Sequence, residues 1–190
     1  MHAGEPVPIE VRRAEVQGLD GHRRLGDLLT GATLLVFLRE FGCPHCAMQV
    51  DGLMARLPEI ESLGVRVVLV GNGPLHAVPA FVETMNLKDR RVTVVTDPSL
   101  ASYRAAGLAR PRFFGWRTPI ETLHAFAAGY WQRRRAGDVM QLGGAFLVDD
   151  AGRVVYSHRS QSPGDLADPN DIVQAALALL VDRRAAGRLV

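Results

Sequence analysis

The chain has 190 residues, of which 47% are hydrophobic and 22% charged, as in a globular protein with one sizeable core. A formal net charge of +2 gives little reason to expect nucleic acid as a partner. No apolar run approaches the roughly 20 residues of a membrane span, and the first residues lack the features of a signal peptide. We therefore expect a cytoplasmic protein that does not bind membranes, a setting that favours reactive over structural cysteines.

The first predicted elements lead to the only two cysteines. Residues 9–21 are predicted to be extended. Residues 33–39 are continuously apolar and β-branched at the centre, which is typical of a strand buried on both faces. Apolar residues then recur at helical spacing from Cys46 onward, until Pro58 and a following glycine end or bend the helix. The sequence thus predicts a strand that runs into Cys43 at the start of a helix.

The next two strand–helix pairs continue the alternation. Residues 65–71 and 91–97 are predicted strands of the buried type. The helix between them begins near Pro79, which suits a first helical turn. Asp97 and Pro98 supply a cap and a first-turn proline for the helix after the second strand. Repeated units of this kind predict parallel strands with helices on both faces.

The C-terminal part departs from this alternation. Residues 145–159 have the pattern of two strands joined by a turn, a predicted hairpin, and a final helix is predicted over 171–181. Residues from about 108 to 142 are too many for a plain loop. We therefore predict one domain over 1–190 with an α/β, thioredoxin-like fold. It has a mixed central sheet flanked by helices, and a helical insertion at 108–142 precedes the C-terminal β-hairpin.

The stretch Cys43-Pro44-His45-Cys46 carries the clearest chemistry. A cysteine at a helix N-cap faces unpaired backbone N–H groups, whose partial positive charge lowers the thiol pKa below the free value of about 8.5. Cys46 lies one turn further on, close enough to form a disulfide. We therefore predict Cys43 as the nucleophile and Cys46 as the resolving thiol. Pro44 suits the first helical turn, and His45 can stabilise the thiolate by charge or by a hydrogen bond.

Other interpretations of the two cysteines have weaker support. A zinc site needs two further ligands, and the remaining candidates are histidines without paired spacing. A c-type haem site needs a histidine directly after the second cysteine, where this chain has Ala47. Two buried cysteines without chemistry remain an alternative, although their position at a strand end argues against it. We predict a redox dithiol without a metal or organic cofactor.

Four segments spread over residues 8–182 form an ordered set of motifs. They are LLVFLREFGCPHCAMQ, VVLVGNG, VVTDPSLASYRAAGL and QLGGAFLVDDAGRVVYSHRS. Together they resemble the peroxiredoxin-like branch of the alkyl hydroperoxide reductase C/thiol-specific antioxidant (AhpC/TSA) superfamily, and more narrowly its selenoprotein L-related members. The resemblance implies a thioredoxin fold with Cys43 at the peroxidatic position.

The chain departs from that family pattern around the expected peroxide site. The usual Thr or Ser three residues before the peroxidatic cysteine is Glu40, and the arginine of the late Arg-Gly-x-Phe pattern is Gly143. Because the hairpin returns toward the cysteines, Arg159 is our candidate replacement, about 10 Å across the sheet, and Arg39 is the other. The alternative for Arg159 is a solvated strand-end charge. Glu40 is expected at the surface, with a role as proton acceptor for Cys46 as the weaker interpretation.

The insertion has two open interpretations. Thr118-Pro119 with Glu121 is a helix start signal. The apolar residues on one face of that helix are Ile120, Leu123, Ala127 and Trp131. They form either a lid over Cys43 that shapes an apolar pocket or docks a partner, or an amphipathic helix that completes the core.

Two functions from different classes fit these features. In the first, an enzyme uses the Cys43–Cys46 dithiol to reduce a hydroperoxide or a disulfide, and a thioredoxin-like or other thiol donor recycles it. In the second, the pair is a non-catalytic redox sensor whose disulfide moves the 108–142 segment and so gates binding to another protein. Turnover separates the two, because a sensor reacts once. The sequence is also compatible with a homodimer.

Overall fold

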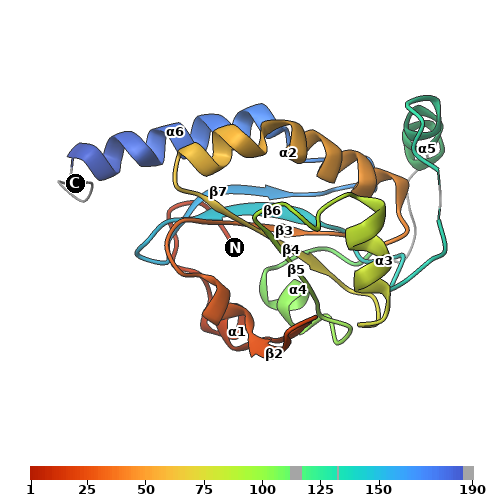
Figure 1. Ribbon diagram of the computed structural model, residues 1–190, viewed down its shortest axis with the longest axis horizontal. Coiled ribbons are helices and arrows are strands. Elements are labelled where there is room, and N and C mark those ends of the chain that lie inside the picture. Colours follow the sequence, from red (N-terminus) through yellow and green to blue (C-terminus); the bar gives the residue numbers. More distant parts are fainter. Residues whose placement is uncertain (112–116, 132, 186–190) are drawn as a thin grey trace.

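The computed structural model describes residues 1–111, 117–131 and 133–185, which form a seven-stranded sheet with helices on both faces (Figure 1). The strand order across the sheet is β2-β1-β5-β4-β3-β6-β7. The strands are β1 (Glu15–Gly18), β2 (Gly21–Arg24), β3 (Thr33–Phe37), β4 (Arg66–Gly71), β5 (Val92–Thr96), β6 (Gly144–Val148) and β7 (Val154–Arg159). Strands β3, β4 and β5 are parallel, whereas β6 pairs antiparallel with β3 and β7 pairs antiparallel with β6. The predicted mixed sheet is confirmed.

Helices cover the sheet in two layers (Figure 1). One layer contains α2 (Pro44–Ser62), α3 (Ala77–Thr84) and α6 (Pro169–Ala185). The other contains α1 (Ile9–Arg13), the 3-10 turn η1 (Leu25–Leu28) and α4 (Ala101–Ala105). As far as the described residues go, none of the helices combines the length and apolar character that crossing a bilayer requires.

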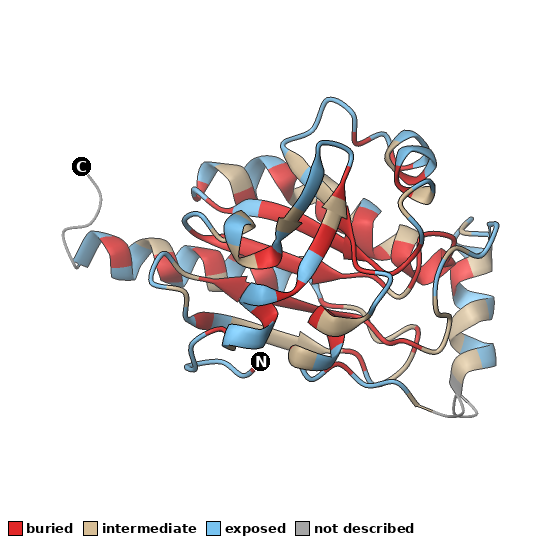
Figure 2. Cartoon of the chain, turned by 90° about the horizontal axis from the view of Figure 1, so that it is seen from below, coloured by how far each residue is buried: buried red, intermediate tan, exposed pale blue. Residues whose placement is uncertain are grey.

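The sheet separates two apolar cores, because side chains alternate along its buried strands. In β3, Leu34 and Val36 pack in the core beneath α2 and α6, whereas Leu35 and Phe37 pack in the core beneath α1 and α4. Every residue of β3 and β6 is buried, as expected of strands covered on both faces. Buried residues accordingly concentrate in the central strands (Figure 2).

Residues 9–21 are not one extended segment, so this prediction is wrong. Ile9–Arg13 form α1, and β1 and β2 then pair as an antiparallel hairpin. Pro8 precedes the helix with φ −54°, and Glu10 in the first turn complements the positive end of the helix dipole. A helix of little more than one turn shows an apolar pattern that periodicity alone cannot separate from that of a strand.

The carboxyl end of β3 is where strand ends converge near the cysteines. Phe37 at the end of β3 pairs with Gly144 at the start of β6, and Gly144 pairs with Arg159 at the end of β7. Val70, near the end of β4, pairs with Phe37 on the other side. The hairpin therefore returns to the cysteine end of the sheet, as predicted.

The described part of the insertion forms α5 (Arg117–Ala127), which stands at one edge of the molecule (Figure 1). Its predicted apolar face points to solvent, with exposed fractions of 48% for Ile120, 65% for Leu123 and 68% for Trp131. The buried contact comes instead from Ala125, which is fully covered. The interpretation that this face completes the core is therefore wrong.

Polar contacts attach α5 to the rest of the fold. The Glu121 carboxylate accepts hydrogen bonds from Ser162 Oγ at 2.6 Å and from the Gly164 backbone N–H at 3.0 Å. These two residues lie in the loop between β7 and α6. The helix is thus fixed against the loop that follows the hairpin, while its apolar side stays uncovered by the described chain.

Candidate active site

The thiol pair sits where α2 begins. Cys43 is the N-cap residue, with φ −72° and ψ 128°, and Pro44 is the first residue of the helix. Proline suits this position because its missing N–H would have no helical partner there. Cys46 lies in the first turn, and both thiols are free and buried, with exposed fractions of 2% for Cys43 and 5% for Cys46. The predicted placement of both cysteines at the helix start agrees with the structure.

Arg39 is the cation that contacts the nucleophile. Its Nη1 donates to Cys43 Sγ at 3.2 Å, and its Nη2 donates to the carbonyl oxygen of Val139 at 2.6 Å. The backbone N–H of Arg39 also donates to Cys46 Sγ at 3.2 Å. Arg39, two residues after the end of β3, therefore contacts both sulfurs and the part of the insertion that leads back to β6. We call this part, residues 133–142, the return stretch.

The two thiols have opposite proton affinities. The pKa of Cys43 is lowered to about 7, first by the hydrogen bond with the Cys46 side chain and then by the Arg39 charge, which together outweigh burial. Burial raises the pKa of Cys46 well above its ordinary value, and the hydrogen bond to Cys43 acts in the same direction. At neutral pH Cys43 is therefore about half thiolate, while Cys46 keeps its proton.

His45 lies in the site but not as a positive charge. Its side chain is buried, with an exposed fraction of 3%, and burial together with the Arg39 charge lowers its pKa. Its Nε2 finds no hydrogen-bond partner among the described residues. A neutral imidazole cannot supply the charge expected of it beside Cys43, and Arg39 fills that position instead.

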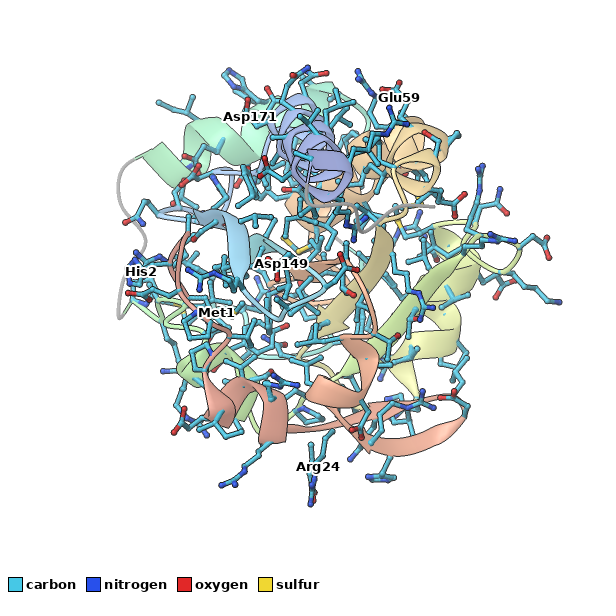
Figure 3. All side chains as sticks on the ribbon, turned by 90° about the vertical axis from the view of Figure 1, so that its left-hand side faces the viewer. Met1, His2, Arg24, Glu59, Asp149 and Asp171 are labelled. Atoms are coloured by element: carbon cyan, nitrogen blue, oxygen red, sulfur yellow. The ribbon has the colours of Figure 1, made fainter. Side chains whose placement is uncertain are left out.

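Arg159 lies at the end of β7 as predicted, but its guanidinium faces the N-terminus of the chain. Its nitrogens lie 3.5 and 3.4 Å from the ring nitrogens of His2, which is labelled in Figure 3. The strand register puts Arg159 on the sheet face of Phe37, opposite the core that contains Cys43. The structure therefore favours Arg39 over Arg159 as the arginine of the site.

Glu40 is not the surface carboxylate that we expected. Its exposed fraction is 1%, and its Oε2 accepts hydrogen bonds from the backbone N–H groups of Gly42 at 3.0 Å and Ala136 at 2.8 Å. The return stretch packs so closely that a Cβ on Gly42 would clash with the carbonyl oxygen of Arg134. Glu40 thus ties the loop before Cys43 to the insertion.

Asn72 is a site residue that the sequence reading missed. Its Nδ2 donates to the carbonyl oxygen of Arg39 at 2.5 Å, and its Oδ1 accepts from the backbone N–H of Asp138 at 3.0 Å. Its place at the end of the strand next to β3 was the available signal, because adjacent parallel strands end at the same sheet edge.

Metal chemistry has no candidate centre in the part of the chain that the structure describes. There, no group of three or more His, Cys, Asp or Glu side chains is placed to hold an ion. Cys43 and Cys46 supply two sulfur atoms, and a zinc site would need two more ligands.

Comparison with known proteins identifies the family. Residues 52–162 match the family model described as AhpC/TSA antioxidant enzyme, which is more than half of the chain. The chain belongs to the AhpC/TSA family. The matched range begins at residue 52, so the match itself does not include Cys43 and Cys46. The AhpC/TSA resemblance seen in the sequence is confirmed, and the chain is a member of a thiol redox family with a Cys43-x-x-Cys46 pair.

Two relatives are similar to this chain over about three quarters of its length. The prostamide/prostaglandin F synthase of Xenopus laevis is 32% identical over 151 residues, covering 75% of this chain and 72% of that protein. The chloroplastic thioredoxin-like protein AAED1 of Arabidopsis thaliana is 27% identical over 158 residues, covering 76% of this chain. The aligned region spans 62% of the length of the Arabidopsis protein.

Solved structures share the fold at low sequence identity. A cysteine-to-serine mutant of the peroxiredoxin 6 of Arenicola marina superposes with a TM-score of 0.71 at 11% identity, covering 96% of this chain and 74% of that chain. Reduced Prx3 from Vibrio vulnificus in complex with hydrogen peroxide has a TM-score of 0.67 at 15% identity, covering 93% and 99%. The predicted thioredoxin-like α/β fold is thereby confirmed.

Proposed function

We propose that the protein is an enzyme that reduces a hydroperoxide with the Cys43 thiolate and resolves the product with Cys46. The observation that carries the proposal is the guanidinium of Arg39 at 3.2 Å from Cys43 Sγ. A fixed positive charge there favours the thiolate, which is the nucleophilic form. It also lies where negative charge passes to the peroxide oxygens as the O–O bond breaks.

The proposed reaction has two chemical steps and a recycling step. The Cys43 thiolate attacks one peroxide oxygen, the O–O bond breaks, and the leaving oxygen takes a proton to become an alcohol or water. Cys43 is then a sulfenic acid. The Cys46 sulfur attacks the Cys43 sulfur, its proton and the hydroxyl leave together as water, and a disulfide forms. A dithiol donor of the thioredoxin type then reduces the disulfide by two exchanges and is itself oxidised, and this step requires that one sulfur of the disulfide becomes accessible after oxidation.

The burial of Cys43 supports a small oxidant over a protein disulfide. With an exposed fraction of 2%, its sulfur offers little surface to a bulky disulfide, which must approach it in line. A hydroperoxide needs room for only two oxygen atoms at the sulfur. Family membership supports thiol redox chemistry, and relatives that are named synthases support an enzyme over a sensor.

A redox sensor is the second candidate, and one contact favours it. Arg39 donates to both Cys43 Sγ and the Val139 carbonyl oxygen, so it connects the thiol to the return stretch of the insertion. Oxidation of Cys43 to a disulfide removes the negative charge that Arg39 contacts. In the sensor proposal, this loss loosens the stretch and changes binding to a partner protein.

The deciding experiment is a single-turnover reaction of the reduced protein with hydrogen peroxide and with an organic hydroperoxide. Tryptophan fluorescence and free-thiol loss are followed for the wild type and for Cys43→Ser. N-acetylcysteine in the same buffer gives the rate of a free thiol. We expect oxidation at least tenfold faster than that reference, with both thiols lost, and no fast phase in Cys43→Ser. Oxidation of the wild type at the reference rate by both peroxides would refute the peroxidase proposal.

Continuous turnover then separates the enzyme from the sensor. Peroxide is supplied in large excess together with thioredoxin, thioredoxin reductase and NADPH. An enzyme consumes many equivalents of NADPH per protein, whereas a sensor stops after one oxidation. A fast single turnover without sustained consumption would therefore favour the sensor.

A further inference from the structure

A cleft of about 500 Å³ lies beside α3, next to the loop that leads to Cys43. Its volume is in the range of small-molecule sites. Phe41, Ala77, Ala80 and Phe81 line its apolar side, and the rings of Phe41 and Phe81 pack at a centroid distance of 4.9 Å. The cleft thus offers an aromatic and aliphatic surface that the redox chemistry of the thiol pair does not use.

The opposite wall of this α3 cleft is strongly basic. Arg133, Arg134 and Arg135 follow one another along it, and all three are exposed. Its described lining residues include no aspartate or glutamate. Within the described chain, no carboxylate forms an ion pair with Arg134 or Arg135. The cleft therefore combines an apolar side with the positive charges of Arg134 and Arg135, which no carboxylate of the described residues neutralises.

The basic wall is held in place by backbone hydrogen bonds. The Arg133 N–H donates to the Gly42 carbonyl oxygen at 3.0 Å, and the Ala136 N–H donates to Glu40 at 2.8 Å. The Arg133 guanidinium also reaches α3, where it donates to Thr84 Oγ1 at 3.4 Å. Because the backbone on both sides of Arg134 and Arg135 is anchored, a ligand binds there without first ordering the chain.

We propose that the α3 cleft binds an organic carboxylate with an apolar chain. The chain lies against Phe41 and Phe81, and the carboxylate is bound by Arg134 and Arg135. Arginine matches this role because its planar guanidinium donates two parallel hydrogen bonds to one carboxylate. A neutral or cationic ligand of the same length gains the apolar contact but not these bonds. This site goes beyond the proposed reaction, because none of its steps uses the cleft.

Calorimetric titration of the 190-residue chain with decanoate, octanoate and decanol tests the two parts of this site. Each buried methylene is worth about a fourfold gain in affinity, so decanoate, with two more methylenes, should bind about fifteenfold tighter than octanoate. Loss of the charge-assisted bonds should make decanol bind at least about tenfold more weakly than decanoate. Binding is measured directly, so the result does not depend on whether the protein is a peroxidase.

Matched variants locate the site. The double variant Arg134→Met with Arg135→Met keeps the aliphatic stems and removes the charges. The control, Arg90→Met with Arg91→Met, removes the same charge from an exposed arginine pair outside the cleft. Ala80→Trp fills the cleft from an exposed position of α3.

We expect the double variant of Arg134 and Arg135 to bind decanoate about tenfold more weakly, the control double variant of Arg90 and Arg91 to bind it as the wild type does, and Ala80→Trp to lose binding. Circular dichroism confirms that each variant is folded. The proposal is overturned if decanoate does not bind, if both arginine pairs have equal effects, or if Ala80→Trp binds as the wild type does.

Discussion

Replacing Arg39 with methionine should raise the pKa of Cys43 from about 7 toward the free-cysteine value of about 8.5. A full charge 3.2 Å from the sulfur contributes about 1 kcal/mol at the dielectric constant of water and about 5 kcal/mol at an effective value of 20. Since about 1.4 kcal/mol corresponds to one pKa unit, even the weaker limit gives a measurable shift. At this weaker limit the pKa rises by about one unit, so the thiolate fraction at pH 7 would fall from about half to about 10%, a roughly fivefold slower reaction.

The assay is the pH dependence of Cys43 alkylation by iodoacetamide, together with the ultraviolet absorbance of the thiolate. Arg39→Lys keeps the charge and should leave the midpoint near that of the wild type. Arg159→Met serves as the control, because this arginine faces His2 rather than the thiol. An unchanged midpoint in Arg39→Met, or a larger shift in Arg159→Met, would refute the assignment of Arg39.

Three further predictions test the rest of the site. Because the pKa of Cys43 is about 7, its thiolate fraction increases about tenfold between pH 6 and pH 8, and the rate of reaction with peroxide should increase by the same factor and then level off. A rate that keeps increasing up to pH 9 would contradict the lowered pKa of Cys43. Cys46→Ser should leave a sulfenic acid on Cys43 that dimedone traps, whereas the wild type should yield little adduct, and equal trapping would exclude Cys46 as the resolving thiol. Glu40→Ala should lower the free energy of unfolding by about 1–3 kcal/mol in urea, because two backbone donors lose a buried acceptor. Glu59→Ala, at an exposed ion pair, should cost less than about 1 kcal/mol, and equal losses would argue against the anchoring role of Glu40.

The elements around the thiols were predictable because their signals are local. A continuous apolar run defines β3, and Pro44 after Cys43 marks the first turn of α2. Neither signal depends on residues far away in the sequence. The same holds for the hairpin, whose two strands are close in sequence. These features placed both cysteines at a helix start at the end of a buried strand.

The partners of the thiols were not predictable in the same way, because they are distant in sequence. The Arg39 side chain meets the Val139 carbonyl across 100 positions, and Glu40 meets Ala136 across 96. Glu40 follows a strand end, where a carboxylate is usually exposed, and the sequence does not show that the segment around Ala136 covers it. Likewise, the apolar face of α5 was visible in its periodicity, but periodicity does not say whether another element covers that face.

The position of Arg39 also accounts for the departure from the family pattern at the late strand. The resemblance puts Gly143 where the family arginine usually stands. Here Gly143 lies directly against β3, and a Cβ at this position would clash with the carbonyl oxygen of Phe37. No side chain fits there without moving the strand, so a cation for Cys43 has to come from another element. Arg39 supplies it from the end of the strand that leads to the thiol, with its backbone fixed by Asn72.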